Sequence, residues 1–182
     1  MWTPGETGAQ ERLADFADQA SQYDERRNLP SLAGTSFLSP HLHFGEISPS
    51  ACWHATMRAG GSVETFLKEL VWRDYAANVI TQFPDYGARD AREGFDALPW
   101  RDVSDPHVAA ELIAWQQGRT GYPIVDAGMR ELWVTGWMHN RVRMIAASFL
   151  IKHLLIDWRH GERWFWDTLV DADYASNAVN WQ

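Results

Sequence analysis

Residues 118–144 read GRTGYPIVDAGMRELWVTGWMHNRVRM, and this stretch decides the fold. Pro123 predicts the first turn of a helix with apolar residues on one face, and Gly136 predicts its end. A second, strongly apolar helix is predicted over residues 138–155. Because the alternating apolar and polar pattern of strands is hard to find anywhere in the chain, we predict an all-α fold with irregular loops.

The other helices are predicted from apolar spacing and from start and stop signals. Ser48 followed by Pro49 is typical of a helix start, with serine as the cap and proline in the first turn. Residues 85–105 are rich in proline and glycine and are predicted to form turns. The remaining predicted helices cover residues 8–22, 49–59, 62 or 63 to just before Pro84, 107–117 and 162–169.

Composition is that of an ordinary soluble globular protein, with 182 residues, 22% charged and 46% hydrophobic side chains. One domain is the default at this length. Cys52 is the single cysteine, so no internal disulfide can form, and a reducing, cytoplasmic location is expected. No run reaches the roughly 18 apolar residues of a membrane span, and the first residues do not read as a secretory signal. We expect a monomer.

The net charge of −8 argues against a protein that only coats nucleic acid. A chain that is acidic overall can still present one positive groove, and residues 139–163 hold such a basic cluster. A solvated helix face is an equally good interpretation of any single one of these charges. The cluster has Arg141, Arg143, Lys152, Arg159 and Arg163 against Asp157 and Glu162.

A second polar string stands near the end, where residues 171–177 read DADYASN and Trp181-Gln182 follow. Arginine, asparagine and aspartate side chains therefore recur in a chain that carries eleven tryptophans. This combination suggests a site that holds a polar, flat, redox-active ring and moves electrons to it.

Three strings, GRTGYPIVDAGMR, TGWMHNRVRM and DADYASN with WQ, closely resemble the flavin-binding helical domain of DNA photolyases and cryptochromes. The resemblance covers essentially all 182 residues but only part of a full-length family member. Residues 1–182 are thus expected to be a partial FAD-binding helical domain that lacks the N-terminal α/β antenna domain and is incomplete at the C-terminus.

Short hydroxyls and backbone amides gather at residues 35–39, a loop-to-helix junction that can hold a phosphate. An ordinary cap and turn is the better interpretation from spacing alone. The resemblance instead implies that this loop wraps the diphosphate of FAD, joined by a tyrosine twelve residues upstream. Phe66 stands where many family members have a cofactor-binding tryptophan. The residues implied are Tyr23, Thr35, Ser36, Phe37, Leu38, Ser39 and Phe66.

His41 and His43 could suggest a metal pair, but one such pair is a weak signal, because zinc needs three or four ligands. Ordinary loop histidines are preferred, and no metal is expected.

Glu69 and Trp72 lie three residues apart on one predicted helix face. Considered alone, they are best explained by an amphipathic helix with a buried Trp72 and a solvated Glu69. In photolyases the matching pair lines the cavity for a flipped-out thymine dimer, where a carboxylate and an indole can bind and stack on the bases. The resemblance thus implies DNA contacts from Glu69, Trp72 and Arg141.

Asn140 and Arg143 begin the most apolar predicted helix, so their polar groups need partners. The resemblance implies a salt bridge between Arg143 and Asp171 along the flavin, and Asp173 at the polar edge of the ring. It places Asn177 against the reactive ring nitrogen. An asparagine there has no carboxyl proton to give, which suits photolyases and their anionic, fully reduced flavin better than sensor proteins.

The resemblance matches Trp181, Trp158 and Trp100 to the tryptophan chain that passes electrons to excited flavin. Large apolar side chains at helical spacing are usually core, which is the preferred interpretation for the other indoles considered. These are Trp115, Trp133, Trp137, Trp164 and Trp166.

The function implied is light-driven repair of cyclobutane pyrimidine dimers in DNA, with catalytic roles for Trp181, Trp158, Trp100, Glu69 and Asn177. The cofactor would be FAD, and the partner would be DNA that contains pyrimidine dimers. Two alternatives stay open, a cryptochrome that signals with the same flavin and an inactive fragment.

Overall fold

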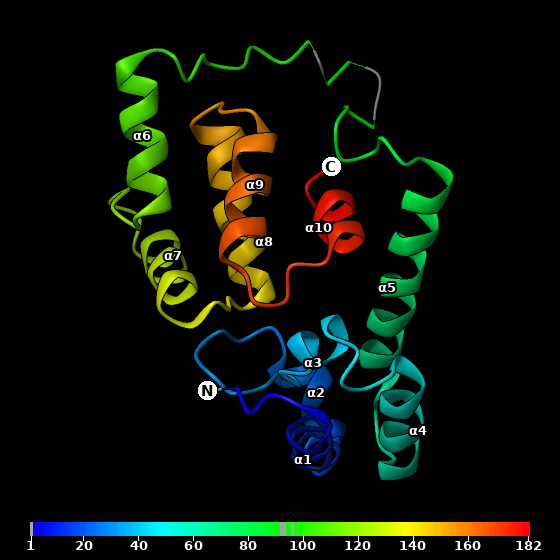
Figure 1. Cartoon of the computed structure of the whole chain (residues 1–182). Helices are drawn as coiled ribbons and strands as arrows, with labels where there is room; N and C mark the ends of the chain where they lie inside the picture. The colour runs from blue at the N-terminus through cyan, green and yellow to red at the C-terminus, as the bar shows by residue number, and fades with distance from the viewer. Residues whose placement is uncertain (1, 92–93, 96) are drawn as a thin grey trace. The chain divides into compact units, whose positions relative to one another are not determined.

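The computed structural model describes residues 2–91, 94–95 and 97–182, and every regular element in these residues is helical (Figure 1). The predicted all-α fold is confirmed. The chain divides into two compact units, Met1–Tyr75 and Ala76–Gln182, each of which has its own apolar core. Within the described part of the chain, no helix is long and apolar enough to span a membrane.

The first unit packs short helices around Phe16, Tyr23 and Phe66. The Phe16 and Phe66 ring centroids lie 4.6 Å apart, and Tyr23 meets both rings edge-on. These interlocked rings fix the segment that leads into the loop at residues 33–38. The elements are α1 (Glu6–Ala17), η1 (Ala20–Gln22), α2 (Tyr23–Arg26), α3 (Ser39–His43), α4 (Pro49–Ala59) and α5 (Glu64–Gln82), which continues into the second unit.

The helix predicted over residues 8–22 is divided in the structure. α1 starts two residues earlier and stops at Ala17, and η1 and α2 follow as separate turns. The apolar spacing continued through Ala20, which is buried, so the sequence pattern did not reveal the break. By contrast, Ser48 caps α4 as predicted, because its Oγ accepts a hydrogen bond from the Ala51 N–H at 3.1 Å.

The second unit is built around the fully buried indole of Trp115. Its Nε1 donates to the Ala146 carbonyl at 3.0 Å, and its ring stacks on Phe165 with centroids 6.0 Å apart. α8 packs closely against α7 in this unit (Figure 1). The elements are α6 (Pro106–Gln116), α7 (Pro123–Thr135), α8 (Asn140–Ser148), η2 (Phe149–His153), α9 (Trp158–Thr168) and α10 (Tyr174–Asn180).

The long helix predicted over residues 138–155 is shorter and less regular in the structure. His139 caps α8, because its Nδ1 accepts from the Arg141 N–H at 3.1 Å, so helical structure begins at Asn140. η2 then forms a π-helical turn, and Leu155 adopts a left-handed backbone conformation with φ of 51°. Gly136 ends α7 as predicted, and the structure shows that it does so in the left-handed conformation.

Candidate functional site

A pocket of about 230 Å³ opens in the second unit between the start of α8, the segment after α9, and α10. Residues that the sequence pointed to in two separate strings, TGWMHNRVRM and DADYASN with WQ, meet here. Polar and apolar side chains both line it, as in sites for small-molecule ligands. The lining includes Asn140, Arg143, Asp171, Asp173, Asn177 and Trp181, together with Met144, Ala147, Phe165, Leu169, Ala172, Ser176 and Asn180.

Arg143 and Asp171 form the charged part of this pocket. Arg143 Nη2 lies 2.9 Å from Asp171 Oδ2, and Arg143 Nε donates to the Met138 carbonyl at 2.8 Å. The Asp171 side chain is only 4% exposed, and its Oδ1 has no hydrogen-bond partner among the described residues. A buried carboxylate oxygen without a partner is an unused acceptor, and a ligand N–H or O–H can supply the missing bond.

Asn177 is held in one orientation by both ends of its amide. Its Nδ2 donates to Glu162 Oε1 at 2.8 Å, and its Oδ1 accepts from Trp181 Nε1 at 3.1 Å. Burial raises the pKa of the Glu162 carboxyl above its ordinary value, against the hydrogen bond from Asn177. Asp173 caps α10 by accepting from the Ser176 N–H at 2.8 Å. Asp173 is therefore positioned by the start of α10, and Asn177 is positioned by Glu162 and Trp181.

All three tryptophans matched to an electron relay pack in or against the apolar core of the second unit. Trp181 is buried and meets Phe165 edge-on, with ring centroids 5.0 Å apart. Trp158 is buried at the start of α9, and Trp100 is half-buried against the same core. The structure thus places the three indoles in one unit, with Trp181 at the pocket.

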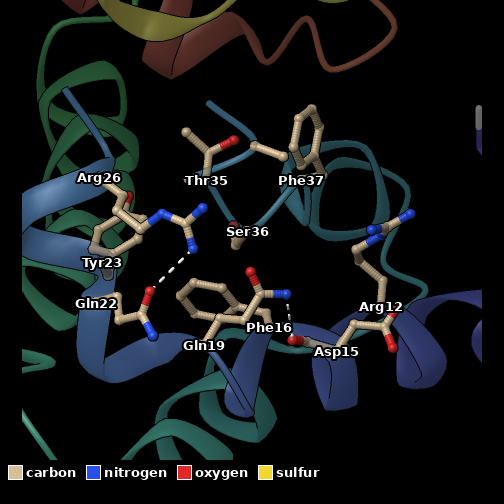
Figure 2. Close-up of a pocket in the computed structure, with 12 residues that line it drawn as sticks. Arg12, Asp15, Phe16, Gln19, Gln22, Tyr23, Arg26, Thr35, Ser36 and Phe37 are labelled. Atoms are coloured by element: carbon tan, nitrogen blue, oxygen red, sulfur yellow. Dashed lines mark hydrogen bonds between the residues drawn. The ribbon is translucent and has the colours of Figure 1, made fainter. Parts of the chain in front are cut away.

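A smaller pocket of about 100 Å³ lies in the first unit, between the exposed side of α1 and the loop at residues 33–37 (Figure 2). Tyr23, Thr35, Ser36 and Phe37 line it, and these are four of the residues that the resemblance implied for the FAD diphosphate. The Thr35 Oγ1 atom is buried and has no hydrogen-bond partner among the described residues. Phe37 has a left-handed backbone, with φ of 54°, which sharpens the turn of the loop.

Three expected members of this site lie elsewhere in the first unit. Leu38 and Phe66 are buried in its apolar core, and Ser39 begins α3. Sequence reasoning in turn missed the polar residues that α1, α2 and the turns between them contribute to the pocket. The α1 members follow helical spacing, which could have found them. The missed residues are Arg12, Asp15, Gln19, Gln22 and Arg26.

Glu69 is firmly bound within the first unit rather than solvated. The Tyr23 hydroxyl donates to its Oε2, and the Arg27 guanidinium pairs with its Oε1. Burial, and then the neighbouring Glu69 charge, raise the pKa of the Tyr23 hydroxyl well above its ordinary value, so the hydroxyl remains a donor. Tyr23 was assigned to the FAD site from the sequence, without a link to Glu69.

Trp72 is 63% exposed, so the buried position that the isolated pattern suggested does not occur. Its ring meets Tyr75 edge-on, with centroids 5.2 Å apart, and both rings are available on the surface of α5. Arg141 is half-buried at the first turn of α8, where one guanidinium nitrogen approaches the Met144 sulfur at 3.5 Å. No group of three or more metal-ligating side chains occurs within the described ranges.

Comparison with known proteins gives one consistent family. The family model for the FAD binding domain of DNA photolyase matches residues 66–182. The deoxyribodipyrimidine photo-lyase of Agrobacterium fabrum is 56% identical over the whole chain, which spans 38% of that relative. Cryptochrome-1 of Arabidopsis thaliana is 41% identical over the whole chain, which spans 28% of it.

Solved structures agree with these relatives. A bacterial class III photolyase from Agrobacterium tumefaciens superposes with a TM-score of 0.92 and 56% identity, and the match covers all of this chain and 38% of that one. An archaeal photolyase from Sulfolobus tokodaii, solved with two FAD molecules, has a TM-score of 0.85 and 37% identity, covering all of this chain and 39% of that one.

Proposed function

This chain belongs to the family of the FAD-binding domain of DNA photolyases, and from that membership we propose that it is the cofactor-binding part of an enzyme that repairs cyclobutane pyrimidine dimers in DNA by light. Because the chain spans 38% of the photo-lyase of Agrobacterium fabrum, this activity is proposed for the full-length protein. We also propose that this enzyme is monomeric and cytoplasmic and that residues 1–182 form part of its FAD-binding domain.

The observation that carries the proposal is the second-unit pocket, where Arg143, Asp171 and Asn177 meet beside Trp181. The unpartnered Asp171 Oδ1 and the fixed Asn177 amide fit the polar edge of an isoalloxazine ring, which offers both donors and acceptors. Arg143, Asp171, Asp173, Asn140 and Asn177 would hold that ring.

The first-unit pocket would hold the phosphate-bearing part of FAD. Thr35 has an unpartnered buried hydroxyl, and the Arg12 and Arg26 guanidiniums line the same small space. A phosphate needs such donors and positive charges. Tyr23 and Ser36 complete the set, and Leu38 and Ser39 would contribute backbone amides. Phe66 would support the site from the core.

When bound and reduced, FAD supplies the light-driven electron that splits the dimer and is afterwards regained. The residues of this chain would bind and orient the cofactor and the DNA. Trp72 offers an exposed face on which a flipped-out base can stack, and Glu69 offers a fixed carboxylate to a base edge. Arg141 would contact the DNA backbone, while Trp181, Trp158 and Trp100 would relay electrons inward.

A cryptochrome is the second candidate, because Cryptochrome-1 of Arabidopsis thaliana aligns over the entire chain. The two functions predict different outcomes with a dimer-containing oligonucleotide. A photolyase repairs the oligonucleotide under blue light, whereas a sensor reduces its flavin in light without repairing DNA.

The experiment uses the full-length protein with bound flavin, and Trp72→Ala is the informative variant. Since base stacking is worth roughly 1–3 kcal/mol, dimer binding should weaken by about tenfold or more, with the flavin spectrum unchanged. Trp133→Ala is the matched control, because Trp133 is also strongly exposed but lies on α7. Equal losses in both variants, or no repair by the unaltered protein, would contradict the proposal.

A further inference from the structure

A loop carboxylate reaches the middle tryptophan of the matched relay. The indole Nε1 of Trp158 donates to Asp90 Oδ1 at 2.7 Å, although the two residues are 68 positions apart in the sequence. Trp158 is 3% exposed and the Asp90 side chain 12% exposed, so water competes little for this bond. Asp90 belongs to the turn-rich segment before α6 and is not a lining residue of either pocket.

Arg159 fastens this loop to the start of α9. Its Nη2 lies 3.2 Å from Asp90 Oδ2, and its Nε donates to the Ala88 carbonyl at 3.2 Å. The same guanidinium lies 4.7 Å from the centroid of the Trp158 ring and pairs with Asp157 at 2.8 Å. Asp90 is thus held against Trp158 by contacts on both of its carboxylate oxygens.

The three relay indoles have different partners at their N–H groups. Trp181 donates to the neutral amide oxygen of Asn177, and Trp158 donates to a carboxylate. The Trp100 Nε1 has no hydrogen-bond partner in the part of the chain that the structure describes. An indole that loses an electron becomes a cation, and a carboxylate at hydrogen-bond distance stabilises that cation more than an amide or no partner does.

We propose that Asp90 is a positioning residue that makes Trp158 easier to oxidise than Trp181 and so draws the positive charge away from Trp181. The inference rests on the relay in the proposed function. In this step one electron leaves Trp158 and fills the vacancy on Trp181, so Trp158 is oxidised and Trp181 is reduced. The Nε1 proton of Trp158 shifts toward Asp90 Oδ1, and the excited flavin remains the ultimate electron acceptor.

The surrounding charges support this direction. The Arg159 guanidinium lies over the Trp158 ring and by itself disfavours a positive charge on that ring. Asp90 and Asp157 both pair with Arg159 and offset its charge. Two carboxylates against one guanidinium leave the cluster with a net negative charge, which favours oxidation of the indole it surrounds. The arrangement also keeps Arg159 bound to oxygen atoms rather than to the ring alone.

The contact itself is tested first, without any electron transfer. In full-length protein labelled with ¹⁵N-tryptophan, Trp158→Phe identifies the Trp158 Nε1–H signal in the NMR spectrum. A carboxylate acceptor moves this signal downfield, so Asp90→Ala should move it upfield and leave the other indole signals in place. If the Trp158 signal does not move, the contact is absent and the proposal is overturned.

The electronic role is then tested by time-resolved absorption of the flavin-loaded full-length protein. Asp90→Asn keeps an oxygen acceptor but removes the charge, so the yield of oxidised Trp158 should fall about tenfold, as expected for the loss of one partly screened charge–charge interaction. Asp85→Asn is the matched control, because Asp85 is an exposed carboxylate in the same loop and pairs with Arg89 instead. This control should behave like the unaltered protein.

The outcomes separate the inference from the function on which it rests. If the unaltered protein forms tryptophan radicals but Asp90→Asn equals Asp85→Asn, the relay stands and the role of Asp90 is overturned. If the unaltered protein forms no tryptophan radical, the relay fails and the inference falls with it. A loss confined to Asp90→Asn, with the NMR signal moved in Asp90→Ala, supports both.

Discussion

Gly161 lies against the indole of Trp181 so closely that a methyl group on Gly161 would stand 2.3 Å from Trp181 Cη2 and 2.6 Å from Leu150 Cδ2. This helical glycine therefore admits the ring that closes one side of the second-unit pocket. The Trp181 ring can occupy this position only because Gly161 has no side chain.

Gly161→Ala should destabilise the protein despite the better helix propensity of alanine. Overpacking a core costs about 1–3 kcal/mol, which outweighs the roughly 1 kcal/mol that alanine contributes within a helix. Chemical denaturation measures the difference. Trp181→Phe removes the clash with the indole and leaves the one with Leu150, so the double variant should be less destabilised than the sum of the two single changes. Strict additivity would show that the two residues do not meet as described.

Arg143→Met should lower the free energy of unfolding by about 3–5 kcal/mol, because the change leaves the buried Asp171 carboxylate without its counter-charge. Arg101→Met is the control, since Arg101 pairs with Glu111 at the surface, where such pairs contribute roughly 0–1 kcal/mol. Urea denaturation at neutral pH compares the two variants. Similar small losses in both would mean that the pair adds little stability.

The helices and the second-unit site could be predicted because their signals are local or family-specific. Pro123 and Gly136 bracket α7 as predicted, and the polar residues of two distant strings meet in one pocket. The division of the first predicted helix was missed because Ala20 continues the apolar spacing. No spacing rule links Trp158 to Asp90, since that bond depends on how a loop packs on the start of α9.

Glu162→Gln should stabilise the protein more at neutral pH than in acid. Burial raises the pKa of Glu162 in the folded state, so folding favours the protonated carboxyl. The stability contributed by this group is fully present below the ordinary glutamate pKa and is lost as the pH rises through the raised value. Glutamine has no such loss and keeps an oxygen to accept from Asn177. The advantage of the variant should therefore grow with pH and then level off.

Asp126→Asn should change the stability in the opposite direction, so that this variant is destabilised more at neutral pH than in acid. Burial alone would raise the pKa of Asp126, but hydrogen bonds from Thr120 and Gly121 outweigh burial and lower it. The stability that Asp126 contributes is present above the ordinary aspartate pKa and is lost as the pH falls through the lowered value. Denaturation curves from acid to neutral pH should thus show the two variants diverging in opposite directions. Parallel curves would contradict both assignments.

Trp181→Phe should slow light-driven reduction of the flavin in the full-length protein by at least about tenfold, because phenylalanine is a much poorer electron donor than an indole; such a factor corresponds to roughly 1.4 kcal/mol in the barrier. Flavin binding should persist, since Arg143 and Asp171 are unchanged and Glu162 still holds the Asn177 amide. The rate of flavin reduction is measured by visible absorption after successive timed periods of illumination. Trp164→Phe is the control, because Trp164 packs against the same core and stacks on Trp133 but is not one of the three proposed relay indoles. Equal rates in the two variants would remove Trp181 from the relay.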